Sequence, residues 1–157
     1  MYRQSSIVQL IVTYCLQEIA DVCSILMHIA KSGYNKEVLV ITFYKEQRQR
    51  LEDAYNRKYM AKYGVKPDVN SDTNRLRIMT VDACQGSEAD WVFLSTVRCN
   101  KSKKIGFLEN KNRANVAISR AREKLVIVGS KTTLQNDKTW GKVAAKAEIV
   151  CSVKHIF

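Results

Sequence analysis

Three short segments combine polar or charged residues with the ends of apolar runs, and each could do chemistry. The first, Val40–Gln47 (VITFYKEQ), ends an apolar run in an aromatic residue, a cation and an amide. The second, Thr80–Asp90 (TVDACQGSEAD), ends another run in a loop with one glycine and three carboxylates. The third, Asn115–Arg122 (NVAISRAR), carries two arginines close together. Such groups contact phosphates, riboses, bases or cations in proteins.

The two arginines of the third segment are candidates for stabilising phosphate charge. An arginine fixed on a packed helix presents a rigid fork that suits phosphate oxygens. On a helical wheel, Arg113 and Arg120 share one flank, whereas Arg122 lies on the other side of an alanine stripe. Arg120 and Arg122 are therefore not expected to do the same job. The alternative is that either one merely pairs with a surface carboxylate.

The glycine of the second segment gives its loop a possible ligand-binding function. Gly86 would let the backbone approach a ligand, and Glu88 would hydrogen-bond a ribose or hold a cation. The alternative is a plain turn with solvated acids. Tyr44, in the first segment, could stack on a base or simply cap the edge of the core. Cys84 has no histidine near it in the sequence, which disfavours a nucleophilic function.

The apolar patterns of the sequence predict the strands and helices that position these segments. Continuous β-branched runs predict buried strands of a mostly parallel sheet over Ile7–Tyr14, Val38–Phe43, Leu76–Val81, Trp91–Val97 and Leu125–Val128. Helical spacing predicts helices over Glu18–Lys31, Lys45 to about Tyr63, Asn110–Lys124 and Lys142–Lys146. This alternation favours an α/β layered domain with right-handed crossovers, in which function is expected in loops at the carboxyl ends of the strands.

Length and charge limit the classes of protein to which this chain can belong. The 157 residues predict one domain, with 26 Lys and Arg against 15 Asp and Glu, a net charge of +11. The charge is uneven: residues 36–66 carry 8 basic and 4 acidic groups, residues 67–97 carry 2 and 5, and residues 98–124 carry 9 and 2. A basic surface attracts nucleic acid through its phosphates. The alternative is a solvated surface without a polyanionic partner.

Several other classes are disfavoured by the sequence. No apolar run approaches the length of a membrane span, and residues 1–6 do not begin a signal peptide, so we expect an intracellular protein, in the cytoplasm or nucleus, that does not bind membranes. The 5 cysteines are scattered and only 2 histidines accompany them, so neither a disulfide framework nor a metal site is predicted. The motifs GxGxxG and GxSxG, which mark other α/β enzymes, are lacking.

Taken together, the three segments resemble helicase motifs IV, V and VI of superfamily 1B, the group that includes the nonsense-mediated-decay RNA helicase and senataxin. VLVITFYKEQ is similar to the motif IV strand, TVDACQGSEADWVFLSTVRCN to motif V and the strand after it, and IGFLENKNRANVAISRAREKLVIVG to motif VI with its following strand. The resemblance runs from about Ile7 to Gly129. Departures are modest: Phe43 replaces a common proline, Ser87 a frequent basic residue, and Ile118-Ser119 the usual Leu-Thr.

The resemblance implies a single second RecA-like domain over residues 1–157, a three-layer fold of the P-loop NTPase type with helices on both faces of the sheet. By motif position, Arg120 would be the arginine finger on the γ-phosphate of ATP, and Gly86 with Glu88 would approach the ribose and phosphates. Single-stranded RNA or DNA would be contacted by residues of motifs V and VI and the strand after motif V: Thr80, Gln85, Arg98 and Arg113.

The phosphate loop of such an enzyme is lacking from this sequence. No GxxxxGK[ST] motif occurs, and no Asp-Glu pair ends a strand as a magnesium-binding Walker B motif would. ATP and Mg²⁺ would therefore be bound mainly by a first RecA-like domain, in cis or in trans, and we expect the chain alone not to hydrolyse ATP. The alternative is a non-catalytic nucleic-acid-binding or regulatory module derived from such a helicase.

Overall fold

One parallel sheet organises the part of the chain that the structure describes. The structure is a computed structural model and describes residues 7–12, 17–70, 75–96, 106–150 and 156–157. Within these residues the six strands run in the order β3-β2-β4-β5-β1-β6, and every neighbouring pair is parallel. The strands are β1 (Ile7–Val12), β2 (Val38–Thr42), β3 (Leu76–Thr80), β4 (Ala89–Ser95), β5 (Ala121–Gly129) and β6 (Glu148–Val150). The predicted parallel sheet is confirmed.

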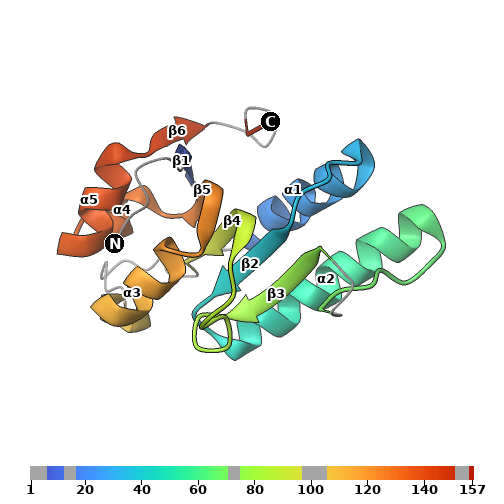
Figure 1. Cartoon of the computed structure of the whole chain (residues 1–157), viewed down its shortest axis with the longest axis horizontal. Helices are drawn as coiled ribbons and strands as arrows, with labels where there is room; N and C mark the ends of the chain where they lie inside the picture. Colours follow the sequence, from blue (N-terminus) through green and yellow to red (C-terminus); the bar gives the residue numbers. More distant parts are fainter. Residues whose placement is uncertain (1–6, 13–16, 71–74, 97–105, 151–155) are drawn as a thin grey trace.

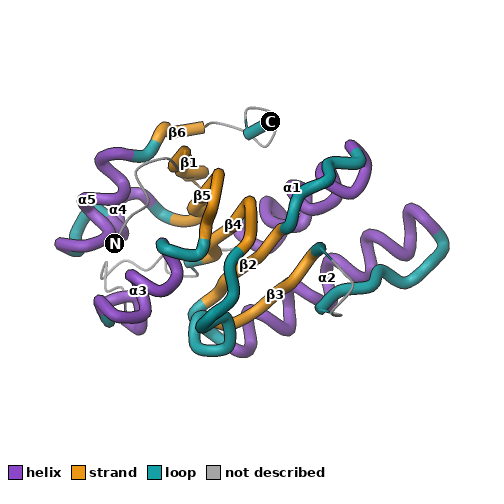
Figure 2. The backbone as a smooth tube through the Cα atoms, viewed as in Figure 1, coloured by secondary structure: helices purple, strands orange, loops and turns teal. Residues whose placement is uncertain are grey.

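Helices cover both faces of this sheet (Figures 1 and 2). The helices α1 (Glu18–Ser32) and α2 (Lys45–Tyr63) pack on one face. The other face carries η1 (Gly106–Glu109), α3 (Lys111–Ile118), α4 (Lys131–Leu134) and α5 (Lys138–Lys146). Along β2, Val38 and Val40 belong to the core under α1 and α2, whereas Leu39 and Ile41 belong to the opposite core. Because helices cover both faces of the sheet, β2 is an unbroken apolar run in the sequence. This is the three-layer α/β RecA-like fold.

The strands agree with the predicted runs to within a few residues where the structure describes them. Strand β2 ends at Thr42 and strand β3 ends at Thr80, each one residue before its predicted end. The strand β4 begins at Ala89, two residues earlier than predicted. The predicted ends at Tyr14 and Val97 lie outside the described residues.

The helix predicted over Asn110–Lys124 is wrong in its second half. The helix α3 starts as expected, because the Asn110 side chain accepts hydrogen bonds from the backbone N–H groups of Asn112 and Arg113. It ends at Ile118, and β5 begins at Ala121, so Arg120 and Arg122 are not helical and the helical wheel does not apply to them. Arg, Glu and Lys favour helices locally, but pairing with β4 overrides this preference.

The C-terminal part of the fold was only partly predicted. The helix α5 starts at Lys138, four residues before the predicted Lys142, because the Asp137 side chain accepts from two backbone N–H groups and caps it. Its Trp140 is fully buried, and the indole Nε1 donates to the Leu108 carbonyl at 2.8 Å. The short elements η1, α4 and β6 carry too few residues to show a period in the sequence.

Candidate nucleotide and nucleic-acid interface

The segment 81–88 carries the predicted motif V loop and crosses the sheet. It connects the carboxyl end of β3 to the amino end of β4. The backbone N–H of Cys84 donates to the Thr80 carbonyl at 3.0 Å, and that of Ser87 donates to the Cys84 carbonyl at 2.9 Å. Gly86 then adopts a φ of 83°, which residues with a side chain rarely adopt. In the described structure no neighbouring atom lies within 4 Å of where a Cβ would stand, so the backbone at Gly86 borders open space.

Cys84 anchors this segment to the core. Its side chain is fully buried, and the thiol Sγ donates to the Val81 carbonyl at 3.2 Å. Desolvation by burial raises the pKa of Cys84 to about 11, although the charge of Arg120 opposes the shift. A thiol with this pKa stays protonated at neutral pH, so its environment fits packing and not nucleophilic attack.

Arg120 lies between α3 and β5 with its guanidinium held by neutral oxygens. Nε donates to the Val116 carbonyl at 2.9 Å, Nη2 to the Ser119 hydroxyl at 2.9 Å, and Nη1 to the Ser87 carbonyl at 3.3 Å. Among the described residues, the ion pairs include no carboxylate at Arg120. Its positive charge is therefore oriented by hydrogen bonds but not neutralised, which suits an arginine that meets a phosphate.

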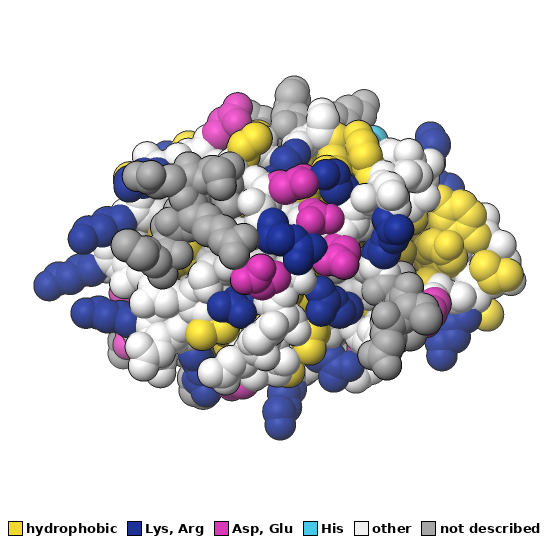
Figure 3. Space-filling view, viewed as in Figure 1, with side chains coloured by type: hydrophobic (Ala, Val, Ile, Leu, Met, Phe, Trp, Pro, Cys, Tyr) yellow, Lys and Arg dark blue, Asp and Glu magenta, His cyan; other side chains and the backbone are white. Residues whose placement is uncertain are grey.

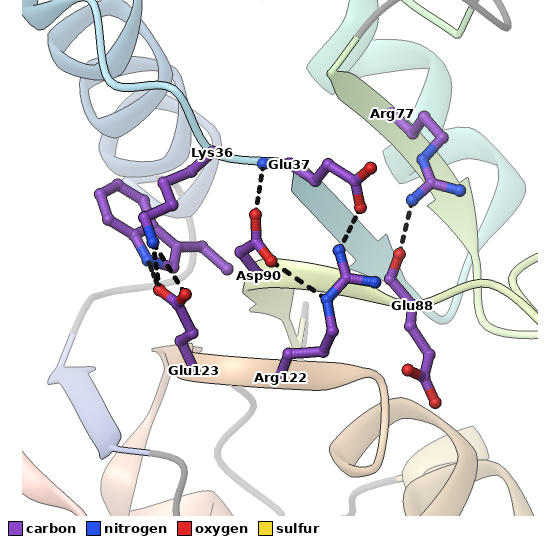
Figure 4. Close-up of polar contacts among 8 residues, drawn as sticks. Lys36, Glu37, Arg77, Glu88, Asp90, Arg122 and Glu123 are labelled. Atoms are coloured by element: carbon purple, nitrogen blue, oxygen red, sulfur yellow. Dashed lines mark hydrogen bonds and ion pairs between the residues drawn. The ribbon is translucent and has the colours of Figure 1, made fainter.

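Arg122, two residues further on, has the opposite environment. Its Nε donates to Asp90 Oδ1 at 3.0 Å, and its Nη2 contacts the carboxylate of Glu37 (Figure 4). Both carboxylates raise the pKa of Arg122 through side-chain hydrogen bonds, Glu37 more than Asp90. The surface ion pair that the sequence left open for either arginine is thus formed by Arg122 and not by Arg120. The expectation that the two residues do different jobs is consistent with these contacts.

The structure places the predicted nucleotide contacts at the amino ends of strands. Gly86 and Glu88 precede β4, and Arg120 precedes β5. The backbone N–H of Ala89 donates to the Arg120 carbonyl at 3.1 Å, which joins the two loops. Function was expected at the carboxyl ends of the strands, whereas these three residues precede the amino ends of β4 and β5. The reason is that the crossover after β3 is short and returns at once to the opposite edge.

Three of the residues predicted to contact nucleic acid, Thr80, Gln85 and Arg113, lie in or contact the segment 80–85. Thr80 ends β3 and is half-buried, and its hydroxyl accepts from the Ala83 backbone N–H at 3.4 Å. Gln85 is exposed in the crossover. Arg113 pairs with Asp82 through two hydrogen bonds, from Nε to Oδ1 at 2.9 Å and from Nη2 to Oδ2 at 3.0 Å. The predicted Arg98 lies outside the described residues.

A cationic groove along β3 was not predicted from the sequence. An open groove of about 1020 Å³ borders Gly86, Ser87 and Glu88, and four basic residues also line it: Lys45, Arg48, Arg75 and Arg77. Arg77 Nη2 donates to the Glu88 carbonyl at 2.7 Å, and Figure 4 shows the Glu88 side chain turned away from Arg77. The available signal was a lone arginine inside the apolar run LRIMT.

In the ranges that the structure describes, no group of three or more His, Cys, Asp or Glu side chains could hold a metal. The described helices likewise include none that is long and apolar enough to cross a membrane. On the face shown in Figure 3, basic and acidic side chains are interleaved near the centre.

A family profile and several curated relatives match most of this chain. The profile of a family described as "AAA domain" matches residues 4–132. Helicase sen1 of Schizosaccharomyces pombe is 33% identical over 139 residues, which cover 86% of this chain and 8% of that protein. The regulator of nonsense transcripts 1 homolog of Arabidopsis thaliana is 36% identical over 125 residues, covering 78% of this chain and 9% of that protein. The chain thus spans less than a tenth of the length of these two relatives.

A solved structure shows the same fold. The C-terminal domain of a possible DNA helicase from Lactobacillus plantarum superposes with a TM-score of 0.62 at 16% identity. The match covers 94% of this chain and 87% of that chain. Strand order and layers therefore belong to a fold that helicase C-terminal domains share.

Proposed function

The chain belongs to the superfamily 1B helicases of the nonsense-mediated-decay and senataxin-like group, as a C-terminal RecA-like domain, and from this premise we propose that it completes the ATP site of a helicase motor. It would supply the arginine finger, Arg120, and part of the surface that binds single-stranded RNA or DNA. ATP and Mg²⁺ would be held mainly by a first RecA-like domain, in cis or in trans.

The environment of Arg120 carries this proposal. Three neutral oxygens orient its guanidinium, and within the described residues no carboxylate neutralises it. An arginine finger needs this combination, because it must present a full charge in a fixed direction to the transferring phosphoryl group. Gly86 and Glu88 belong to the loop whose Ser87 carbonyl contacts Arg120, so they would meet the same nucleotide.

Single-stranded nucleic acid is the second partner in this proposal. The chain carries a net charge of +11, and Arg113 is held by an exposed carboxylate that a phosphate could replace. Thr80, Gln85 and Arg98 would add contacts from motif V and the segment that follows β4. An ATP-independent binding module is the competing interpretation, since the sequence lacks a phosphate loop.

The proposal is tested by ATP hydrolysis in the full-length polypeptide that carries this domain. Arg120→Ala should lower kcat for nucleic-acid-stimulated hydrolysis by roughly 10³-fold or more, the contribution typical of an arginine finger. Arg120→Lys should recover little, because a lysine has no planar fork. The matched control is Arg50→Ala, which breaks an exposed ion pair on α2 and should leave kcat unchanged. Hydrolysis that survives Arg120→Ala, with unchanged single-strand binding, would favour the binding module.

A further inference from the structure

A β-bulge lies between the two strands that follow the candidate nucleotide contacts. Ala89 of β4 pairs with Ala121 of β5, and the next aligned pair is Trp91 with Lys124. One residue of β4, Asp90, therefore faces two residues of β5, Arg122 and Glu123. Bulges of this kind re-aim side chains and are over-represented beside active sites. The bulge begins at Asp90 on β4, two residues after Glu88, and at Arg122 on β5, two residues after Arg120.

Two consecutive residues before β2 bind the two β5 residues of the bulge (Figure 4). Lys36 Nζ lies 2.7 Å from Glu123 Oε2, and Glu37 pairs with Arg122. In the dipeptides Lys36-Glu37 and Arg122-Glu123, the basic residue of each thus pairs with the acidic residue of the other across β4. Asp90 closes the arrangement, since it accepts from Arg122 Nε and from the Glu37 backbone N–H, each at 3.0 Å. We call these five residues the bulge clamp: Lys36, Glu37, Asp90, Arg122 and Glu123.

The bulge clamp is placed to control the distance between the two loops of the site. Ahead of the bulge, the Ala89 N–H to Arg120 carbonyl bond is the described backbone link between the loops. The bulge separates it from the regular ladder that resumes at Trp91 and Lys124. Without the clamp, the ends of β4 and β5 would keep this backbone link but lose the side-chain contacts beside it, and the contact between Arg120 and Ser87 would loosen.

We propose that the bulge clamp positions the arginine finger, with Arg122 and Asp90 as positioning residues that act through Arg120. The inference rests on the proposed function, because it concerns the same nucleotide site. The clamp side chains are partly exposed, with relative areas of 35% for Arg122, 23% for Asp90 and 49% for Glu37. Exposed ion pairs contribute little to stability. Their effect should therefore appear in the geometry of Arg120 more than in the folding of the domain.

A double-mutant cycle between positions 120 and 122 in the full-length polypeptide tests this proposal. Arg122→Gln should lower kcat for ATP hydrolysis about 10- to 100-fold, the cost of a small misplacement of a catalytic group. KM for ATP should change by less than about twofold, because the loss falls on the transition state. In the Arg120→Ala background, Arg122→Gln should have no further effect on kcat, since the residue through which it acts is already gone. Arg50→Gln, which breaks an exposed ion pair in the first half of α2, is the matched control.

The outcomes separate the inference from the proposed function. Equal losses of kcat from Arg122→Gln in both backgrounds, or no loss in either, would overturn the bulge clamp while leaving the arginine finger intact. No loss from Arg120→Ala would overturn both. Glu37→Gln removes one charge of the clamp and leaves the Arg122 contact to Asp90 in place. It should give a smaller loss of kcat with an unchanged melting temperature, and an unchanged kcat in this variant would also contradict the clamp.

Discussion

Arg120 and Arg122 stand two residues apart and differ in what their charges face. Arg122 is compensated by Glu37 and Asp90, whereas Arg120 is held by a hydroxyl and two backbone carbonyls. Arg120 lies in the turn before β5, whereas Arg122 lies in β5 where the register with β4 shifts, and the two guanidiniums contact different partners. The sequence alone could show that two arginines were present, but not which carboxylates reach them, because Glu37 lies 85 positions away.

At the residue scale, the contacts of Asp90 predict how the stability of the fold depends on pH. The Glu37 backbone N–H and then Arg122 hold the pKa of Asp90 below its usual value. Folding therefore favours the ionised carboxylate, so its stabilising contribution is present at neutral pH and is lost as pH falls from the ordinary aspartate pKa of about 3.9 through the lowered pKa of the folded chain. We expect Asp90→Asn to lower the urea midpoint at pH 7. The difference from the native chain should shrink as pH falls below about 4.

The same carboxyl-to-amide change on α2 provides the control for this measurement. Asp53 is exposed and accepts one side-chain hydrogen bond, from Gln49. Asp53→Asn should shift the urea midpoint less than Asp90→Asn at pH 7. A gap between Asp90→Asn and the native chain that stays constant from pH 7 to pH 3 would contradict the assignment of Asp90 as a stabilising anion.

At the scale of elements, the apolar runs predicted β1 to β5 and the helices α1 and α2 because both faces of the sheet are buried. The same reasoning failed at α3 and β5, where alanines at helical spacing continue into a strand. Ala121 is buried, as the helical spacing also predicted, so burial does not discriminate between helix and strand, and its pairing with Ala89 of β4 places it in β5. That pairing is a long-range contact which no local pattern encodes. It also explains why the amino-edge location of Arg120 was not predicted.

The cap of α3 gives an element-scale prediction. The Asn110 side chain accepts from two backbone N–H groups at the start of the helix, at 3.0 and 3.2 Å. Asn110→Ala should lower the free energy of unfolding by about 1 kcal/mol, measured by urea denaturation. Asn112→Ala is the matched control, because Asn112 is exposed within the first turn and should change stability by less than about 0.5 kcal/mol. Equal losses from both variants would show that Asn110 is not the cap.

At the scale of the whole molecule, charge predicts how binding depends on salt. The net charge of +11 should make single-strand affinity fall as salt rises, because binding releases condensed counterions. If Arg113 exchanges Asp82 for a phosphate, Arg113→Ala should reduce the slope of log affinity against log salt by about 0.7. Fluorescence anisotropy with a labelled oligonucleotide measures this slope. Arg50→Ala should leave it unchanged, and an unchanged slope in Arg113→Ala would remove that residue from the nucleic-acid surface.

The central claim, that this domain completes an ATP site whose phosphate loop lies elsewhere, is tested most directly by reconstitution. ATP hydrolysis would be measured for the purified chain alone and during titration with a separately purified first RecA-like domain, in the presence of single-stranded nucleic acid. We expect no hydrolysis by the chain alone, a saturable rise on titration, and no rise with Arg120→Ala. Nucleic-acid-stimulated hydrolysis by the chain alone, abolished by Arg120→Ala, would contradict the claim.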